Sequence, residues 1–87
     1  MEVVEALETI KGLASANRIR LVAHALGRAA QRGATYRDVR HALVNANECV
    51  ANVQREGSWR VTGPDIDGDQ LTCICVIEDA VVVITLF

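Results

Sequence analysis

The sequence is poor in aromatic residues, with one tryptophan, one tyrosine and one phenylalanine among its 87 residues. Since 51% of the residues are hydrophobic, we expect one compact domain with a mainly aliphatic core. No apolar run approaches the length of about 18 residues that a membrane span requires, so a membrane partner is not expected. The first ten residues carry Glu2, Glu5 and Glu8 in place of a basic segment, which argues against a secretory signal.

Cysteine is present in an odd number and without the spacing of a metal site. The three cysteines are Cys49, Cys73 and Cys75. Cys73 and Cys75 alternate with Ile74 and Val76 and share a strand face with apolar neighbours, which predicts small buried thiols. This usage is typical of a reducing, cytoplasmic location, and we expect no metal and no other cofactor.

Three aspartates, Asp65, Asp67 and Asp69, resemble the start of a calcium loop. Such a loop needs glycine at its sixth position, where this chain has Gln70, and no flanking helices are visible. A polar hairpin turn around Asp67-Gly68 is the better interpretation.

The formal net charge of −2 hides a segregation along the chain. Residues 11–40 hold seven basic residues against Asp38 alone, a balance of +6. Residues 1–10 carry −3 and residues 41–87 carry −5. Eight of the nine basic residues are arginine, which binds phosphate in a bidentate manner. The positive segment either attracts a polyanion or forms a solvated face with ion pairs to the acidic half.

Apolar residues at helical spacing predict helices over residues 2–14, 24–31 and 36–46. Gly33 is well suited to end the second helix, and Thr35–Asp38 forms a capping-box-like start for the third. Residues 18–23 fit either a short half-buried strand or a continuation into the following helix.

From Glu48 onward the apolar period changes to two, which is typical of strands. Four strands are predicted, around residues 50–53, 59–61, 71–77 and 81–87. Gly63-Pro64-Asp65 is expected to end the second strand, and the last strand is apolar on both faces, so it should be central. The sequence therefore predicts an α+β fold, with two to three N-terminal helices packed on a twisted antiparallel sheet of about four strands.

A row of polar side chains on the second helix is the strongest chemical signal. His24, Arg28 and Arg32 are spaced by four residues and lie along one side. The other side is expected to face the core and consists of Ala25, Leu26, Ala29 and Ala30. Arg37 and His41 repeat the same spacing on the third helix. A histidine beside arginines is suited to phosphoryl transfer, although arginine on a solvated helix face is also common.

Several short motifs occur in an order that resembles a known bacterial family. They are His24-Ala25, Arg28, Arg32-Gly33, the helix start Thr35–Val39, Ala42-Leu43, Arg60 with Gly63, Asp67-Gly68 and Thr85 in the last strand. The chain resembles small proteins of unassigned function related to the MqsR-like and BrnT-like toxins of the RelE/ParE-like fold. The similarity covers residues 18–87 of a single domain over residues 1–87, with residues 1–17 as a helical extension.

The resemblance implies the toxin of a type II toxin–antitoxin pair, a metal-independent endoribonuclease that acts on mRNA and is neutralised by a cognate antitoxin. It implies His24 as acid or base, Arg32 and Arg60 as phosphate clamps, and Tyr36 as a weaker candidate for acid or stacking. The residues expected to bind RNA are Arg28, Arg20, Arg37 and Thr85. The alternative is a non-catalytic interaction module whose basic helical face binds an acidic partner, and the sequence leaves a homo-oligomer open.

Overall fold

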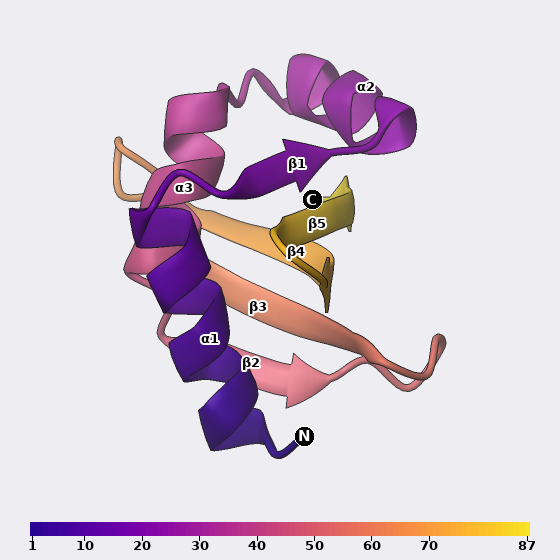
Figure 1. Ribbon diagram of the computed structural model, residues 1–87. Helices are drawn as coiled ribbons and strands as arrows, with labels where there is room; N and C mark the ends of the chain where they lie inside the picture. Colours follow the sequence, from indigo (N-terminus) through magenta and orange to yellow (C-terminus); the bar gives the residue numbers. More distant parts are fainter.

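The computed structural model describes residues 1–87 and places three helices where the apolar residues recur every three to four positions (Figure 1). Helix α1 spans Val3–Ser15, α2 spans Ala23–Arg32 and α3 spans Tyr36–Val44. The predicted helices are thus confirmed to within a few residues. No helix combines the length and the apolar character needed to cross a membrane.

The junction between α2 and α3 follows the expected capping chemistry. Gly33 ends α2 in the left-handed conformation, with φ of 77°. Thr35 Oγ1 accepts from the Asp38 amide at 3.2 Å, and Asp38 Oδ2 accepts from the Thr35 amide at 2.9 Å. These reciprocal bonds form a capping box and fix the first turn of α3.

The sheet has five strands in the order β1-β5-β4-β3-β2. Their bounds are β1 Ile19–Leu21, β2 Glu48–Ala51, β3 Ser58–Pro64, β4 Gln70–Ile77 and β5 Val81–Leu86. Strands β2 to β5 form the predicted antiparallel meander. Strand β5 lies between two strands, as expected of a central strand, only over Val81–Val83, because β1 does not pair with it beyond Val83. The expectation of a purely antiparallel sheet of about four strands is incomplete, because β1 adds a fifth strand parallel to β5, with Arg20 opposite Val82.

Two strand boundaries differ from the prediction. Val53 is not in a strand but is 96% exposed, because the Asn52 amide bonds to the Ser58 carbonyl and closes a turn. Pro64 does not break β3, which continues to pair with Gln70 of β4. Pairing between β2 and β3 ends at Thr62, so β3 has no neighbouring strand on that side at Pro64. The amide hydrogen that proline lacks would therefore have had no strand partner there.

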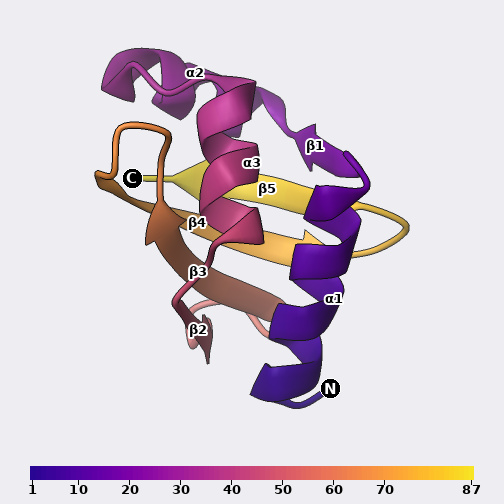
Figure 2. The same ribbon diagram turned by 90° about the vertical axis from the view of Figure 1, so that its left-hand side faces the viewer.

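Helices α1 and α3 pack on one face of the sheet and enclose the core (Figure 2). This face of β4 carries Leu71, Cys73 and Cys75, all fully buried. The approach of α3 is closest at Gly63, where an added Cβ would lie 2.1 Å from the Ala42 carbonyl oxygen.

Helix α2 lies past the end of β1, beside the remainder of β5 (Figure 1). It buries only Ala25 and Ala29, while Leu26 is 57% exposed. The expectation that Leu26 and Ala30 face the core is wrong. Helix α2 packs beside β5 and not across a face of the sheet, so the contact is narrow and buries only two small side chains, Ala25 and Ala29.

The second face of the sheet carries neither α1 nor α3 (Figures 1 and 2). Across it, directly paired residues form the row Val50, Arg60, Ile74 and Thr85. Because paired residues point to the same side, Arg60 and Thr85 share this open face.

Candidate nucleic-acid interface

The polar side of α2 faces the C-terminal end of the sheet. His24 Nε2 lies 3.1 Å from Thr85 Oγ1, and Arg28 Nε donates to the Leu86 carbonyl at 3.2 Å. One turn further, the Arg32 guanidinium donates through Nη2 to the Gln70 carbonyl. The i, i+4, i+8 spacing therefore brings three predicted site residues to one edge, together with Thr85.

Arg60 reaches the same region from β3. Its guanidinium carbon lies 5.3 Å from the ring centroid of Phe87, which follows β5 and is 43% exposed. Only β4 separates β3 from β5, so the Cα atoms of Arg60 and Thr85 are about 10 Å apart. We call the group His24, Arg28, Arg32, Arg60, Thr85 and Phe87 the α2–β5 site.

The α2–β5 site contains a shallow hollow of about 280 Å³ between Arg28, Arg32 and Phe87. Arg28 uses only Nε in the protein, which leaves both terminal nitrogens free to donate. His24 supplies an imidazole, and Phe87 supplies an aromatic face. The arrangement is suited to binding a phosphate with a base stacked beside it.

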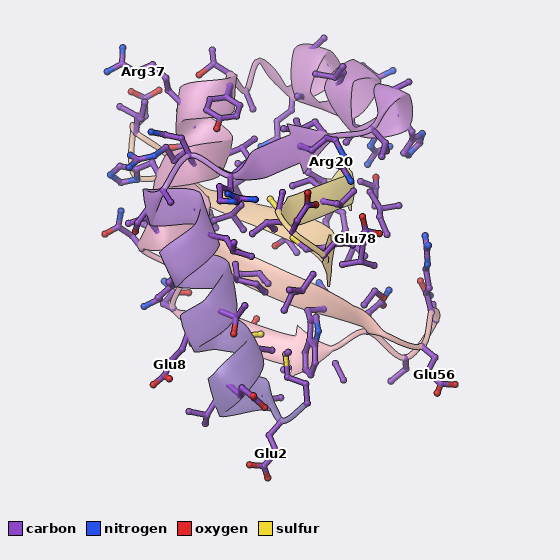
Figure 3. All side chains as sticks on the ribbon, viewed as in Figure 1. Glu2, Glu8, Arg20, Arg37, Glu56 and Glu78 are labelled. Atoms are coloured by element: carbon purple, nitrogen blue, oxygen red, sulfur yellow. The ribbon has the colours of Figure 1, made fainter.

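Ion pairs do not neutralise this site. Both ion pairs of the molecule belong to Arg20, which lies 3.0 Å from Glu78 and 3.9 Å from Asp79. The expectation of ion pairs between the basic segment and the acidic half holds for Arg20 alone. Arg20 lies on β1, and its partners lie in the β4–β5 turn (Figure 3). Arg20 therefore lies outside the α2–β5 site and also outside the second group of predicted site residues, which lies around α3.

Tyr36 and Arg37 lie in a second place, around α3. They line a groove of about 550 Å³ that shares no residue with the α2–β5 site. We call this the α3 groove; its lining residues are Asn17, Tyr36, Arg37, Arg40, His41 and Ile66. The sequence prediction named neither Arg40 nor His41 as a site residue, although the four-residue spacing of Arg37 and His41 was a signal for the latter.

The largest hollow, about 690 Å³, lies away from both groups, beside the β2–β3 turn. Apolar residues such as Met1 and Trp59 line much of it, and Glu56 is its one charged residue. It offers little chemistry for a polar reaction.

The cysteines are free, buried thiols, as predicted. Burial raises the pKa of Cys73 to about 12, and the nearby positive charge of Arg32 offsets only part of this effect. Burial also raises the pKa of Cys49 and of Cys75. None of the three is therefore a thiolate nucleophile at neutral pH.

The acidic turn between β3 and β4 is held by hydrogen bonds from its backbone amides to the Asp65 carboxylate. Asp65 Oδ1 accepts from the amides of Asp67 and Asp69, both at 2.9 Å, and Gly68 adopts φ of 90°. These bonds confirm the polar hairpin turn. The fold brings no three His, Cys, Asp or Glu side chains together in an arrangement that could hold a metal ion.

Comparison of the chain with known protein families, with curated proteins and with solved structures returns no match.

Proposed function

We propose that this protein is the toxin of a type II toxin–antitoxin pair and cleaves mRNA without a metal ion, using the α2–β5 site. One observation carries the proposal: His24 is held against Thr85 on the same side of α2 as Arg28 and Arg32, and no carboxylate neutralises these arginines or Arg60. A histidine and arginines without carboxylate partners on one surface provide proton transfer and phosphate binding.

The reaction is an intramolecular displacement within the RNA. The 2′-oxygen attacks the adjacent phosphorus, the bond from phosphorus to the 5′-oxygen breaks, and a 2′,3′-cyclic phosphate forms. Neutral His24 accepts the 2′-hydroxyl proton, and water protonates the departing 5′-oxygen. Arg28, Arg32 and Arg60 stabilise the negative charge that develops on the phosphoryl oxygens.

Thr85 and Phe87 have supporting roles in this proposal. The Thr85 hydroxyl is hydrogen-bonded to Nε2 of His24 and so orients the imidazole, leaving Nδ1 for the substrate. Phe87 is exposed, and the part of its ring that the Arg60 guanidinium does not cover offers a stacking surface for a base.

The antitoxin in this proposal adds a strand to an edge of the sheet. Strand β2 is one edge of the sheet. The Asn52 amide donates to the Ser58 carbonyl of β3, so every second residue of β2, counted back from Asn52, also points its backbone groups towards β3. The backbone groups of Cys49 and Ala51 then point outward, and Val50 beside them is 44% exposed. Amide exchange at Cys49 and Ala51 should slow when an antitoxin binds there.

The test is cleavage of an RNA transcript in EDTA by the full chain. We expect a 2′,3′-cyclic phosphate product, no cleavage of the same sequence with 2′-deoxyribose, and a large loss of rate in His24→Ala and Arg60→Ala. Arg55→Ala is the matched control, because Arg55 is an exposed arginine in the β2–β3 turn. An inactive wild-type protein, or full activity of His24→Ala, would contradict the proposed reaction.

One observation favours a second candidate, a non-catalytic module whose basic helical face binds an acidic partner. Arg28 and Arg32 already donate to backbone carbonyls, so they have a structural reason to be present without any substrate. The module predicts that RNA or an acidic protein binds without cleavage and that His24→Ala binds as well as the wild type.

A further inference from the structure

The α3 groove gathers cationic and aromatic side chains that the α2–β5 site does not use. Four of its residues, Tyr36, Arg37, Arg40 and His41, lie within the first two turns of α3. Asn17, from the turn after α1, and Ile66, from the β3–β4 turn, complete the wall. At about 550 Å³, the groove has the size of pockets that hold small organic ligands.

The hydrogen bond of His41 fixes its tautomer. Nδ1 lies 2.8 Å from the Pro64 carbonyl oxygen, and a carbonyl can only accept, so Nδ1 donates. The lone pair of the neutral ring is therefore on Nε2. This nitrogen forms no hydrogen bond within the protein and is not buried, so it remains available to a ligand in the groove. When the ring is protonated, Nε2 becomes a charged donor suited to an anion.

One fixed and one free arginine stand beside His41. Arg40 donates through Nε to the Ala14 carbonyl at 3.1 Å and through Nη2 to the Ser15 carbonyl at 3.0 Å. These bonds hold its guanidinium at the groove and leave Nη1 unused. Arg37 forms neither a hydrogen bond nor an ion pair within the protein and extends into solvent from α3 (Figure 3).

The neighbouring carboxylates are occupied by other donors. Asp38 accepts from the backbone amides of Thr35 and Ile66, and these bonds lower its pKa. Asp65 accepts from amides within its own turn. Neither carboxylate pairs with Arg37 or Arg40, so the cations of the groove remain available to an external anion.

Tyr36 supplies an aromatic surface at the same place. Its hydroxyl donates to the Asn17 carbonyl at 3.4 Å, which tethers the ring at one end. Tyr36 is the first residue of α3 and is 42% exposed. A tethered, exposed ring beside a cationic cluster is suited to stacking with a nucleobase.

We propose that the α3 groove binds a nucleotide, with its phosphate on Arg37, Arg40 and His41 Nε2 and its base on Tyr36. The site requires no bond to be cut, and it does not rest on the reaction proposed for the α2–β5 site. Its donors and its aromatic ring come from adjacent positions of one helix, so they move as a unit.

The test uses the full chain labelled with ¹⁵N and titrated with AMP, adenosine and inorganic phosphate, with the His41 ring nitrogens observed by NMR. We expect saturable binding of AMP with a shift at Nε2, weaker binding of phosphate and no saturation by adenosine. Equal affinities for AMP and phosphate, or for AMP and adenosine, would overturn the proposed nucleotide site.

Variants test the individual contacts. We expect Arg37→Ala and His41→Asn each to weaken AMP binding about tenfold or more, since each removes a charge-assisted hydrogen bond. The asparagine amide can still donate to the Pro64 carbonyl, and an unchanged melting temperature will show that the fold is retained. Arg55→Ala should bind AMP like the wild type. An unchanged AMP affinity in both groove variants, or an equal loss in Arg55→Ala, would contradict the assignment.

Discussion

A single small residue determines how closely a helix packs on the sheet, and Gly63 is the clearest case. It lies in β3 where α3 crosses the sheet, and an added Cβ would be 2.1 Å from the Ala42 carbonyl and 2.9 Å from the Ala46 Cα. Both are backbone atoms, so neither can rotate away. Hydrogen in place of a side chain is therefore what allows α3 to approach the sheet.

Gly63→Ala should accordingly lower the free energy of unfolding by about 2 kcal/mol, as in an overpacked core. Gly27→Ala is the matched control, because Gly27 lies inside α2 and an added Cβ meets no atom within 4 Å. The control should gain about 1 kcal/mol from helix propensity. Urea unfolding of both variants measures the difference, and equal stability of the two would show that α3 does not rest on Gly63.

The buried thiols predict how stability changes with pH. The pKa of Cys73 is about 12 in the folded protein and near 9 in an unfolded chain. Above pH 9 the unfolded chain loses this proton while the folded protein keeps it, so stability falls as pH rises from about 9 towards 12. Urea unfolding at pH 8 and at pH 10, about one pH unit on either side of the unfolded-state pKa near 9, measures the decline. The decline should be smaller in Cys73→Ala, and an identical slope in that variant would contradict the assignment.

At the scale of secondary structure, the sequence predicts helices and long strands well because their periodicity extends over several turns or residues. The capping box at Thr35 and the left-handed Gly33 were predictable for the same local reason. Strand β1 was predicted only as one of two alternatives for residues 18–23, because three residues carry too little periodicity to distinguish a strand from a helix. Its partner Val81–Val83 is also about 60 residues away, and no local pattern reports that contact.

The candidate sites show the same division. Helical spacing predicted that His24, Arg28 and Arg32 lie on one side. The first two contact the end of β5, and Arg32 contacts Gln70 at the start of β4. Spacing could not reveal that Tyr36 and Arg37 belong to a different groove, because that separation depends on where α3 packs. Nor could it reveal the bond between His41 and the Pro64 carbonyl, which joins two elements 23 residues apart.

Helix α2 is weakly attached, and this affects any test of the α2–β5 site. It buries only two alanines, and Val22 at its N-cap gives no side-chain cap. The polar contacts of His24 and Arg28 with β5 therefore contribute a large share of the interactions that hold α2 in place. We expect α2 amides to exchange faster than those of α1 and α3, and Arg28→Met to speed α2 exchange about tenfold by removing a charged hydrogen bond.

Val22→Ser gives the opposite change, since serine at an N-cap stabilises a helix by about 1 kcal/mol. Exchange in α2 should slow in this variant while exchange in α3 stays constant. If Arg28→Met leaves α2 exchange unchanged, the Leu86 carbonyl contact does not hold the helix. Loss of RNA binding in that variant would then reflect the charge itself.

For the whole molecule, the distribution of charge matters more than its sum. The acidic total would oppose an RNA partner if it were spread evenly, but three arginines of the α2–β5 site have no carboxylate partner.

Contact with RNA at three phosphates should give a slope of roughly −2 for log affinity against log salt with a single strand. Arg60→Ala should make the slope shallower by about 0.7, while Arg20→Ala should leave it nearly unchanged because Glu78 already neutralises Arg20. Filter binding or fluorescence anisotropy between 50 and 200 mM salt, a range of about fourfold over which counterion release is well resolved, measures these slopes. A slope that Arg60→Ala and Arg20→Ala reduce equally would mean that RNA responds to the overall charge of the molecule and not to the α2–β5 site.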